Sequence, residues 1–204
     1  MAREIMPDYL KTEFVKIIDR KHFAKEANPI RTKAFDNFVE KGLPNKKDEN
    51  WRFTDLSSIK KSSYRISEKK DAPKTDHYIS DYELQSLKSI VIYNGHFQES
   101  ISHLPDGLRV VSNQSYMEQN NWAVLQPTKS SFDLLNTAFM DSGVSLIVDK
   151  GIEINEPIRL LFICSSDEKL MTSPRIHVDV GESSSLSLFE QHVGDCNEYF
   201  FNQS

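Results

Sequence analysis

After Gly143 the chain runs through a succession of short strand-like segments with no helical pattern between them. Apolar residues recur at every second position in 144–148 and again in 176–180, and the run 158–164 is almost continuously apolar apart from Arg159. Alternation with a period of two predicts strands with one buried face. A row of such strands without intervening helices predicts an all-β layer.

The corners between these strands narrow the choice of architecture. A sandwich, an antiparallel barrel and a parallel β-helix all fit a row of short strands. No Asn-Gly or Asp-Gly pair occurs between residues 144 and 193, which disfavours tight hairpins. The corners at 149–151 and 155–157 turn the chain after a few residues, with a further short strand expected at 152–154 between them. The pattern therefore favours the β-helix.

The N-terminal part shows a helical period instead. Leu10, Phe14, Ile17 and Ile18 place one apolar stripe on a helix expected from Asp8 to Glu26. A second helix is expected to take Asn28 as its N-cap and Pro29 as its first residue, and to stop at Gly42. Its buried face is predicted to consist of Ile30, Ala34, Phe35, Phe38 and Val39. The two helices together predict a helical hairpin.

Residues 57–142, in the middle of the chain, show less regular patterns of secondary structure. Residues 57–80 are rich in Ser and Lys and are interpreted as a mobile connection or a long surface loop. Short strands are expected at 90–93 and 108–111, and a helical stretch around 132–140. The expected fold is α+β, with a helical N-terminal region at 1–56, the polar connection at 57–80, a mixed entry segment at 81–142 and a β region at 143–204.

Charge and composition exclude several classes of protein. The net charge of −5 is divided between +6 in residues 1–75 and −11 in residues 76–204. No stretch approaches the roughly 18 uncharged apolar residues of a membrane span, and the N-terminus lacks a signal-peptide core, so we expect a cytoplasmic protein. The basic run at 60–74 has one aromatic residue and is interpreted as a solvated linker, not as a nucleic-acid site.

The residue types that carry chemistry do not form a recognisable motif. Cys164 and Cys196 lie outside any CxxC pair, so a disulfide framework is not expected, and Cys164 is interpreted as a small buried hydrophobe. His177, which is expected to face away from the core, and His192 are attributed to chance placement, not to a metal site. No Ser, Cys or Asp partner at a recognisable spacing accompanies the remaining histidines, and no catalytic residue is predicted; these histidines are His22, His77, His96 and His103.

Four blocks of residues, in order, resemble the SufB/SufD family of iron–sulfur cluster assembly proteins. The first is Gly42–Leu56, which contains Trp51, Arg52, Thr54 and Asp55. The other blocks are Val91–Phe97 with Leu104–Leu108, then Leu135–Gly143 with Val148–Ile158, and finally Ser173–Ile176 with Leu188–Glu190. The opening helices followed by the Trp-Arg pair favour the SufD branch of the family over SufB.

The resemblance implies a helical N-terminal region, a right-handed parallel β-helix core and a C-terminal helical region, of which the third is absent here. It implies a non-catalytic scaffold subunit whose partners are a SufB-like paralogue and a SufC-like ATPase. The family's cluster site lies beyond the matched residues, so an incomplete chain that binds no metal or cofactor itself is expected. The iron–sulfur cluster belongs to the assembled complex.

Two further interpretations concern the Trp-Arg pair and the β region. Trp51 and Arg52 either form a partner-docking patch or have a structural role, in which Trp51 anchors the loop onto the helical hairpin and Arg52 pairs with a carboxylate. The structural role is favoured. The alternative to a scaffold is a β-helical carbohydrate-active enzyme, which would need clustered carboxylates. Those available fall mainly at corners: Asp149, Glu153, Glu156 and Asp179.

Overall fold

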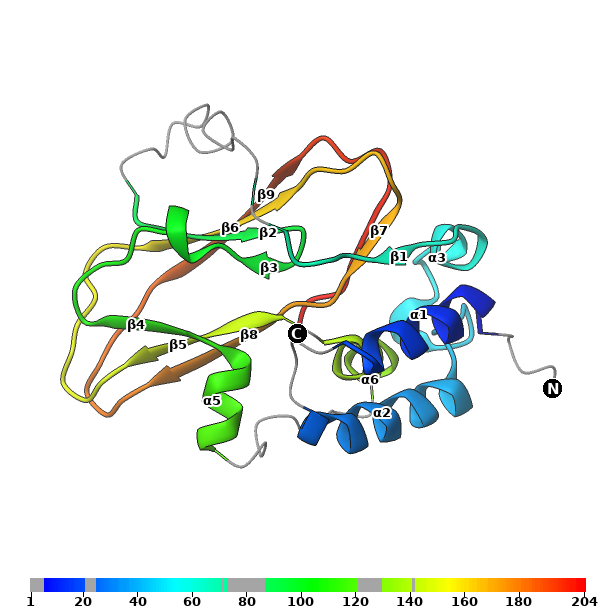
Figure 1. Ribbon diagram of the computed structural model, residues 1–204, viewed down its shortest axis with the longest axis horizontal. Helices are drawn as coiled ribbons and strands as arrows, with labels where there is room; N and C mark the ends of the chain where they lie inside the picture. The colour runs from blue at the N-terminus through cyan, green and yellow to red at the C-terminus, as the bar shows by residue number, and fades with distance from the viewer. Residues whose placement is uncertain (1–5, 21–24, 71, 73–86, 121–129, 141) are drawn as a thin grey trace.

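Helices α1, α2 and α6 gather at one end of the computed structural model, beside a stack of strands (Figure 1). The structure describes residues 6–20, 25–70, 72, 87–120, 130–140 and 142–204. Its helices are α1 (Asp8–Ile18), α2 (Asn28–Lys41), α3 (Ser57–Lys61), α5 (Asn113–Gln119) and α6 (Ser131–Phe139), with 3₁₀ turns η1 (Lys25–Ala27), η2 (Glu49–Trp51) and η3 (Glu99–Ile101). Its strands are β1 (Arg65–Ile66), β2 (Ser89–Tyr93), β3 (His96–Phe97), β4 (Leu108–Ser112), β5 (Gly143–Val148), β6 (Ile158–Cys164), β7 (Leu170–Thr172), β8 (Arg175–Val180), β9 (Leu188–Gly194) and β10 (Tyr199–Phe201).

The strands after Gly143 wind in groups of three. Each strand of the first winding pairs in parallel with the strand three places later in the chain: β5 with β8, β6 with β9, and β7 with β10. The β6–β9 ladder aligns seven residue pairs, from Ile158 opposite Leu188 to Cys164 opposite Gly194. The second winding therefore lies on the first, and the predicted row of strands without intervening helices is confirmed.

Earlier strands extend the same three sheets. β1 pairs in parallel with β7, β2 pairs in parallel with β6, and β4 pairs antiparallel with β5. The resulting sheet orders are β1-β7-β10, β3-β2-β6-β9 and β4-β5-β8. The strands expected at 90–93 and 108–111 are confirmed as β2 and β4, and the helix expected at 132–140 is confirmed as α6.

The interpretation of 57–80 as a mobile connection is wrong for its first part. Residues 57–61 form α3, and β1 joins the first winding through its pairing with β7. Tyr64 and Ile66 are buried in the core, which anchors the segment although most of its residues are polar. Two residues of strand are too short to produce a visible alternation, so pattern alone missed β1. Residues 71 and 73–80 lie outside the described residues.

The inside of the winding is apolar. In the β5–β8 register Val144, Leu146 and Val148 lie opposite Ile176, Val178 and Val180, so the inward residues of one winding stack on those of the next. Side chains from the facing sheets complete this core, and its buried members are Ile90, Ile92, Leu108, Val144, Leu146, Val148, Ile154, Ile158, Leu160 and Phe162. The recurrence of an apolar residue at every second position of β5 and β8 thus specifies which face of these strands points inward.

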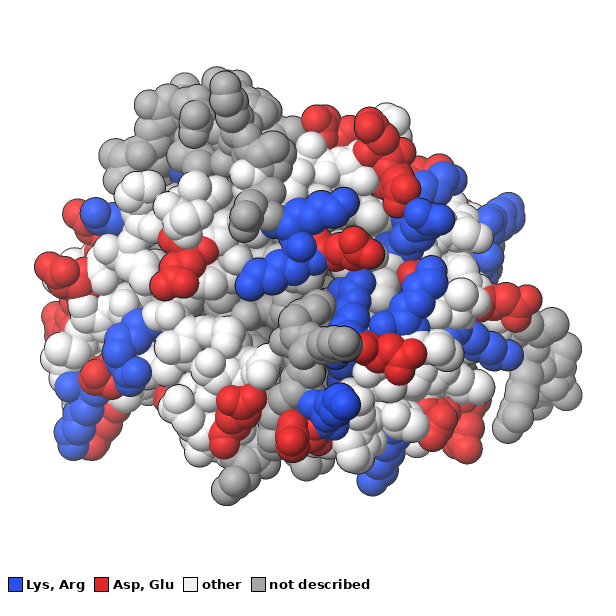
Figure 2. All heavy atoms as spheres, viewed as in Figure 1, with Lys and Arg blue, Asp and Glu red and all other residues white. Residues whose placement is uncertain are grey.

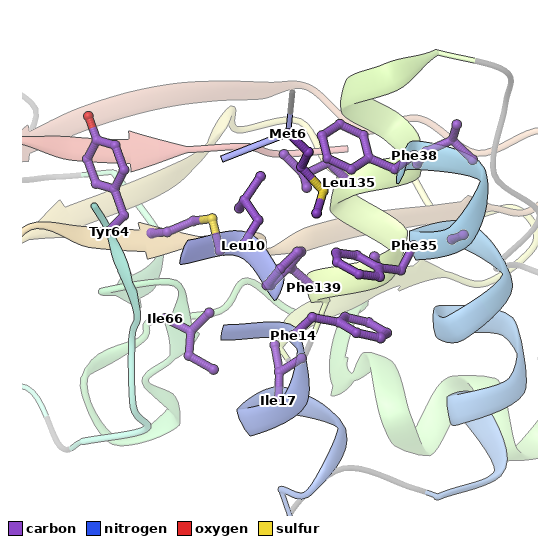
Figure 3. Close-up of a cluster of buried hydrophobic side chains, with 14 of the residues drawn as sticks. Met6, Leu10, Phe14, Ile17, Phe35, Phe38, Tyr64, Ile66, Leu135 and Phe139 are labelled. Atoms are coloured by element: carbon purple, nitrogen blue, oxygen red, sulfur yellow. The ribbon is translucent and has the colours of Figure 1, made fainter. Parts of the chain in front are cut away.

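A second core joins the helices to the β1-β7-β10 sheet (Figure 3). The rings of Phe14 and Phe35 stack with their centroids 3.9 Å apart, and Phe139 of α6 meets Phe14 edge-on at 5.8 Å. Met171 of β7 and Phe200 of β10 belong to the same buried cluster. The helical end is therefore packed directly on the strands.

The helices differ from expectation at their ends and faces. α1 stops at Ile18, where its apolar stripe ends, and not at Glu26. Asn28 is the first helical residue of α2 and does not cap it, because its side-chain amide donates to the carbonyl of Ile18, 3.3 Å away. Arg31 takes a buried place on α2, where Nε donates to the carbonyl of Ala138, whereas Val39 is exposed. Gly42 ends the helix as predicted, with a φ of 74°.

One strand was also predicted wrongly, and several short elements were not predicted. Residues 152–154 form no strand and contribute a single bridge, Glu153 to Ser185. The elements α5, β3 and β7 were not predicted, since each is short or polar. Short elements of this kind are specified by their neighbours and not by a local period.

Truncation of α6 should show how strongly the second core depends on that helix. Leu135 is fully buried there, so Leu135→Ala should lower the free energy of unfolding by about 2–5 kcal/mol. Val15→Ala on the exposed face of α1 is the control and should change it by less than about 0.5 kcal/mol. Urea denaturation followed by circular dichroism measures both values. Equal effects in the two variants would contradict this packing.

Candidate functional site

The Trp-Arg motif begins at Trp51, the last residue of η2, and packs against the rest of the molecule through that tryptophan. The ring of Trp51 packs against Phe132 of α6, with 4.9 Å between the ring centroids. The backbone N–H of Thr54 donates to the carbonyl of Trp51 at 3.0 Å, which closes the turn after the tryptophan. Trp51 was expected to contact the helical hairpin; the aromatic contact shown here is to α6. Its functional role stays a prediction.

The two residues after the tryptophan point into solvent. Phe53 is 88% exposed, and the guanidinium of Arg52 lies 4.4 Å from the centre of its ring. Within the described part of the chain, no carboxylate forms an ion pair with Arg52, so the predicted pairing is not found. A cation above an exposed aromatic ring contributes about 0.5–1 kcal/mol.

Asp55 fixes the start of α3. Its Oδ1 accepts the backbone N–H of Ser57 at 2.9 Å, and its Oδ2 accepts the hydroxyl of the same residue at 3.0 Å. These hydrogen bonds, the backbone one foremost, lower the pKa of Asp55. Bonds to the ionised carboxylate favour the charged form.

An aromatic groove of about 540 Å³ opens beside Trp51. Its lining comes from the motif, α3, the residue before β1, α6 and β10, and includes Trp51, Tyr64, Phe132, Tyr199 and Phe200. The Tyr199 hydroxyl lies 2.9 Å from Oγ1 of Thr172. Burial raises the pKa of Tyr199 to about 12, since the phenolate would lose its hydration there.

A larger polar cleft of about 810 Å³ lies between α1 and β1. Figure 2 shows Lys and Arg side chains gathered over this region. Acidic side chains line the cleft as well, and two of the bases are paired: Lys16 with Glu13, and Arg65 with Glu168 at 3.1 Å. Cations and carboxylates therefore balance within this cleft.

At the edge of this cleft the structure pairs two residues that the sequence did not connect. Oγ of Ser67 lies 3.2 Å from Nε2 of His96, and both residues are buried. We expected no partner for His96, because the two residues are 29 positions apart and match no known spacing. The register of β1 and the β2–β3 hairpin brings them together. A buried hydroxyl and imidazole satisfy each other's hydrogen-bonding capacity.

The expectation that the cysteines do not pair is wrong. Cys164 and Cys196 form a disulfide with 5.9 Å between their Cα atoms. His192 lines the same surface pocket as both cysteines. His177 lies elsewhere, opposite Ser145 on the outer face of β8, where its ring contacts Tyr116. In the described ranges, no three His, Cys, Asp or Glu side chains form a group suited to a metal ion.

The carboxylates weighed for a carbohydrate-active site make separate contacts. Asp149 forms an exposed ion pair with Arg109 at 3.2 Å. Asp179 accepts a hydrogen bond from the Tyr116 hydroxyl at 3.0 Å. Desolvation raises the pKa of Tyr116, and the hydrogen bond to Asp179 raises it further.

Within the described ranges, no helix combines the length and hydrophobicity that crossing a lipid bilayer requires.

Comparison with known proteins identifies the family of the chain. Residues 9–160 match the family model of the SufBD protein N-terminal region. The chain is also 29% identical over 162 residues to an iron–sulfur cluster assembly SufBD family protein of Synechocystis sp.. That match covers 74% of this chain and 35% of the relative, so the chain spans about a third of the relative's length. The chain belongs to the SufBD family.

Two aromatic substitutions separate packing from exposure in the motif. Trp51→Ala removes the contact with Phe132 and should lower the free energy of unfolding by about 1–3 kcal/mol. Phe53→Ala should change it by less than about 0.5 kcal/mol, because that ring is exposed. Chemical denaturation of both variants measures the difference. A larger loss from Phe53→Ala would refute the anchoring role of Trp51.

The raised pKa of Tyr199 should affect stability at high pH. Its folded-state pKa lies above the ordinary value of 10, so its contribution to stability is complete below pH 10 and decreases as the pH rises to about 12. Subtracting the tyrosinate absorbance titration of Tyr199→Phe from that of the parent isolates this residue. The difference should have its midpoint near pH 12, and a midpoint near 10 would show an unburied phenol.

Proposed function

We propose that this protein is a SufD-like, non-catalytic scaffold subunit of the Suf iron–sulfur cluster assembly complex, acting in the cytoplasm. The observation that carries the proposal is the match of residues 9–160 to the SufBD N-terminal region. The relative in Synechocystis sp. is itself named as an iron–sulfur cluster assembly protein. The opening helices and the Trp51-Arg52 pair favour SufD over SufB.

We further propose that the winding from β5 to β10 is the start of a right-handed parallel β-helix. Three observations support this. Each strand pairs in parallel with the third strand after it, the inward residues stack from one winding to the next, and the chain turns at short corners. Stacked repeats of this kind build a continuous apolar core that no single winding can form alone.

We propose that the protein assembles with a SufB-like paralogue and a SufC-like ATPase. The support for these partners is the membership of the SufBD family, to whose N-terminal region residues 9–160 match.

Affinity purification tests this role. The tagged gene product, produced in its own host, should recover a SufB-like paralogue and a SufC-like ATPase, identified by mass spectrometry. Recovery of the tagged protein alone would refute the proposed role.

A further inference from the structure

We propose that the Cys164–Cys196 disulfide is a thiol–disulfide exchange site that accepts a small-molecule thiol. The proposal is independent of the assembly role, because it rests on the local geometry of β6 and β9. The two cysteines are 32 residues apart, and the winding brings them to the same end of these two strands.

A glycine creates the space at this site. Cys164 ends β6 and lies opposite Gly194, the last residue of β9. A Cβ at Gly194 would lie only 1.9 Å from the carbonyl oxygen of Cys164, and the φ of 151° at this glycine is also unfavourable for other residues. With no side chain at position 194, the chain turns back and brings Cys196 over Cys164.

A pocket of about 380 Å³ opens directly on the disulfide. Its walls include Phe162 and His192, whose rings stack with centroids 4.8 Å apart. His192 is about half exposed, so the pocket is open to solvent on that side. The volume suffices for a small thiol, which can approach the sulfur atoms from this opening.

The two cysteine residues differ in exposure. Cys164 is buried, with 7% of its surface exposed, whereas Cys196 is only partly buried. Exposed disulfides are the ones open to exchange, and the reaction occurs at the sulfur that the incoming thiolate can reach. The geometry therefore assigns the attack to Sγ of Cys196.

The reaction balances without a further reactant. The incoming thiolate forms a new S–S bond with Cys196, and the Cys164–Cys196 bond breaks, so that Cys164 leaves as a thiolate and takes a proton from water. A second molecule of the small thiol can then attack the mixed disulfide at the sulfur that came from the first small thiol. That step releases the Cys196 thiolate and the oxidised small thiol, and leaves the protein as the dithiol.

The corner that carries Cys196 has other attachments. The backbone N–H of Asp195 donates to the carbonyl of Cys164 at 3.0 Å. Glu198 accepts the Ser62 hydroxyl at 2.8 Å and pairs with Lys169 at 2.5 Å. These contacts hold the β9–β10 corner in place when the disulfide opens, so exchange does not require unfolding.

Thiol labelling and mass spectrometry test the proposal. The chain purified in air should take up no iodoacetamide in denaturant before reduction, and two groups after it. Native protein incubated with reduced glutathione and quenched with acid should carry glutathione on Cys196. The variants Cys164→Ser and Cys196→Ser each leave one thiol. Cys196 in the first should react with glutathione disulfide about tenfold or more faster than Cys164 in the second.

Three results would overturn the proposal. They are two free thiols in the air-purified chain, a glutathione adduct that forms only in denaturant, and a Cys164 thiol that reacts as fast as Cys196. Far-ultraviolet circular dichroism of both single variants checks that their fold is retained. The glutathione experiment uses the unmodified chain, so it still tests the proposal if either variant misfolds.

Discussion

The buried amide of Asn136 holds the helices and the winding together. Its Nδ2 donates to the carbonyls of Pro174, just before β8, and Asn202, just after β10, at 3.1 and 2.7 Å. Its Oδ1 accepts from Nε of Arg175 at 3.2 Å, and Arg175 reaches on to Asp133 of the same helix. Desolvation lowers the pKa of Arg175, and the Asp133 carboxylate opposes that change. Removal of the Asn136 side chain would leave its buried hydrogen-bond partners unsatisfied, which costs about 1–3 kcal/mol of folding free energy for each group.

Other parts of the protein meet on the same helix. Phe139 contacts Phe14 and Phe35 of the helical hairpin. Phe132 contacts Trp51 of the motif. The helical end, the family motif and the first two windings are therefore each fixed by α6. This explains why a nine-residue helix is buried along most of its length.

Sequence patterns predicted the elements in which buried apolar residues recur at a regular spacing. The alternation in 144–148 and 176–180, together with the apolar run 158–164, identified the central strands, and the motif residues identified the family. The remainder depends on register between distant segments. The disulfide follows from Cys164 lying opposite Gly194, and the pairing of Ser67 with His96 follows from the position of β1. No local period encodes such pairings, because each arises when strands that are far apart in sequence align.

The parallel winding also has a consequence for the order in which the chain can fold during synthesis. Contacts between the two windings join residues about one winding apart, such as Arg159 and Gln191 at a separation of 32. β2 is buried along its whole length but pairs with β6, and Ser89 meets Arg159 across 70 residues. The contacts of β1 form later still, because the partner of Arg65, Glu168, lies 103 residues further along the chain. As the chain leaves the ribosome, only the last two residues of the apolar strand Ser89–Tyr93 can pair early, with β3, and its other edge has no partner until β6 has emerged. An unpaired apolar edge of this kind exposes the nascent protein to aggregation.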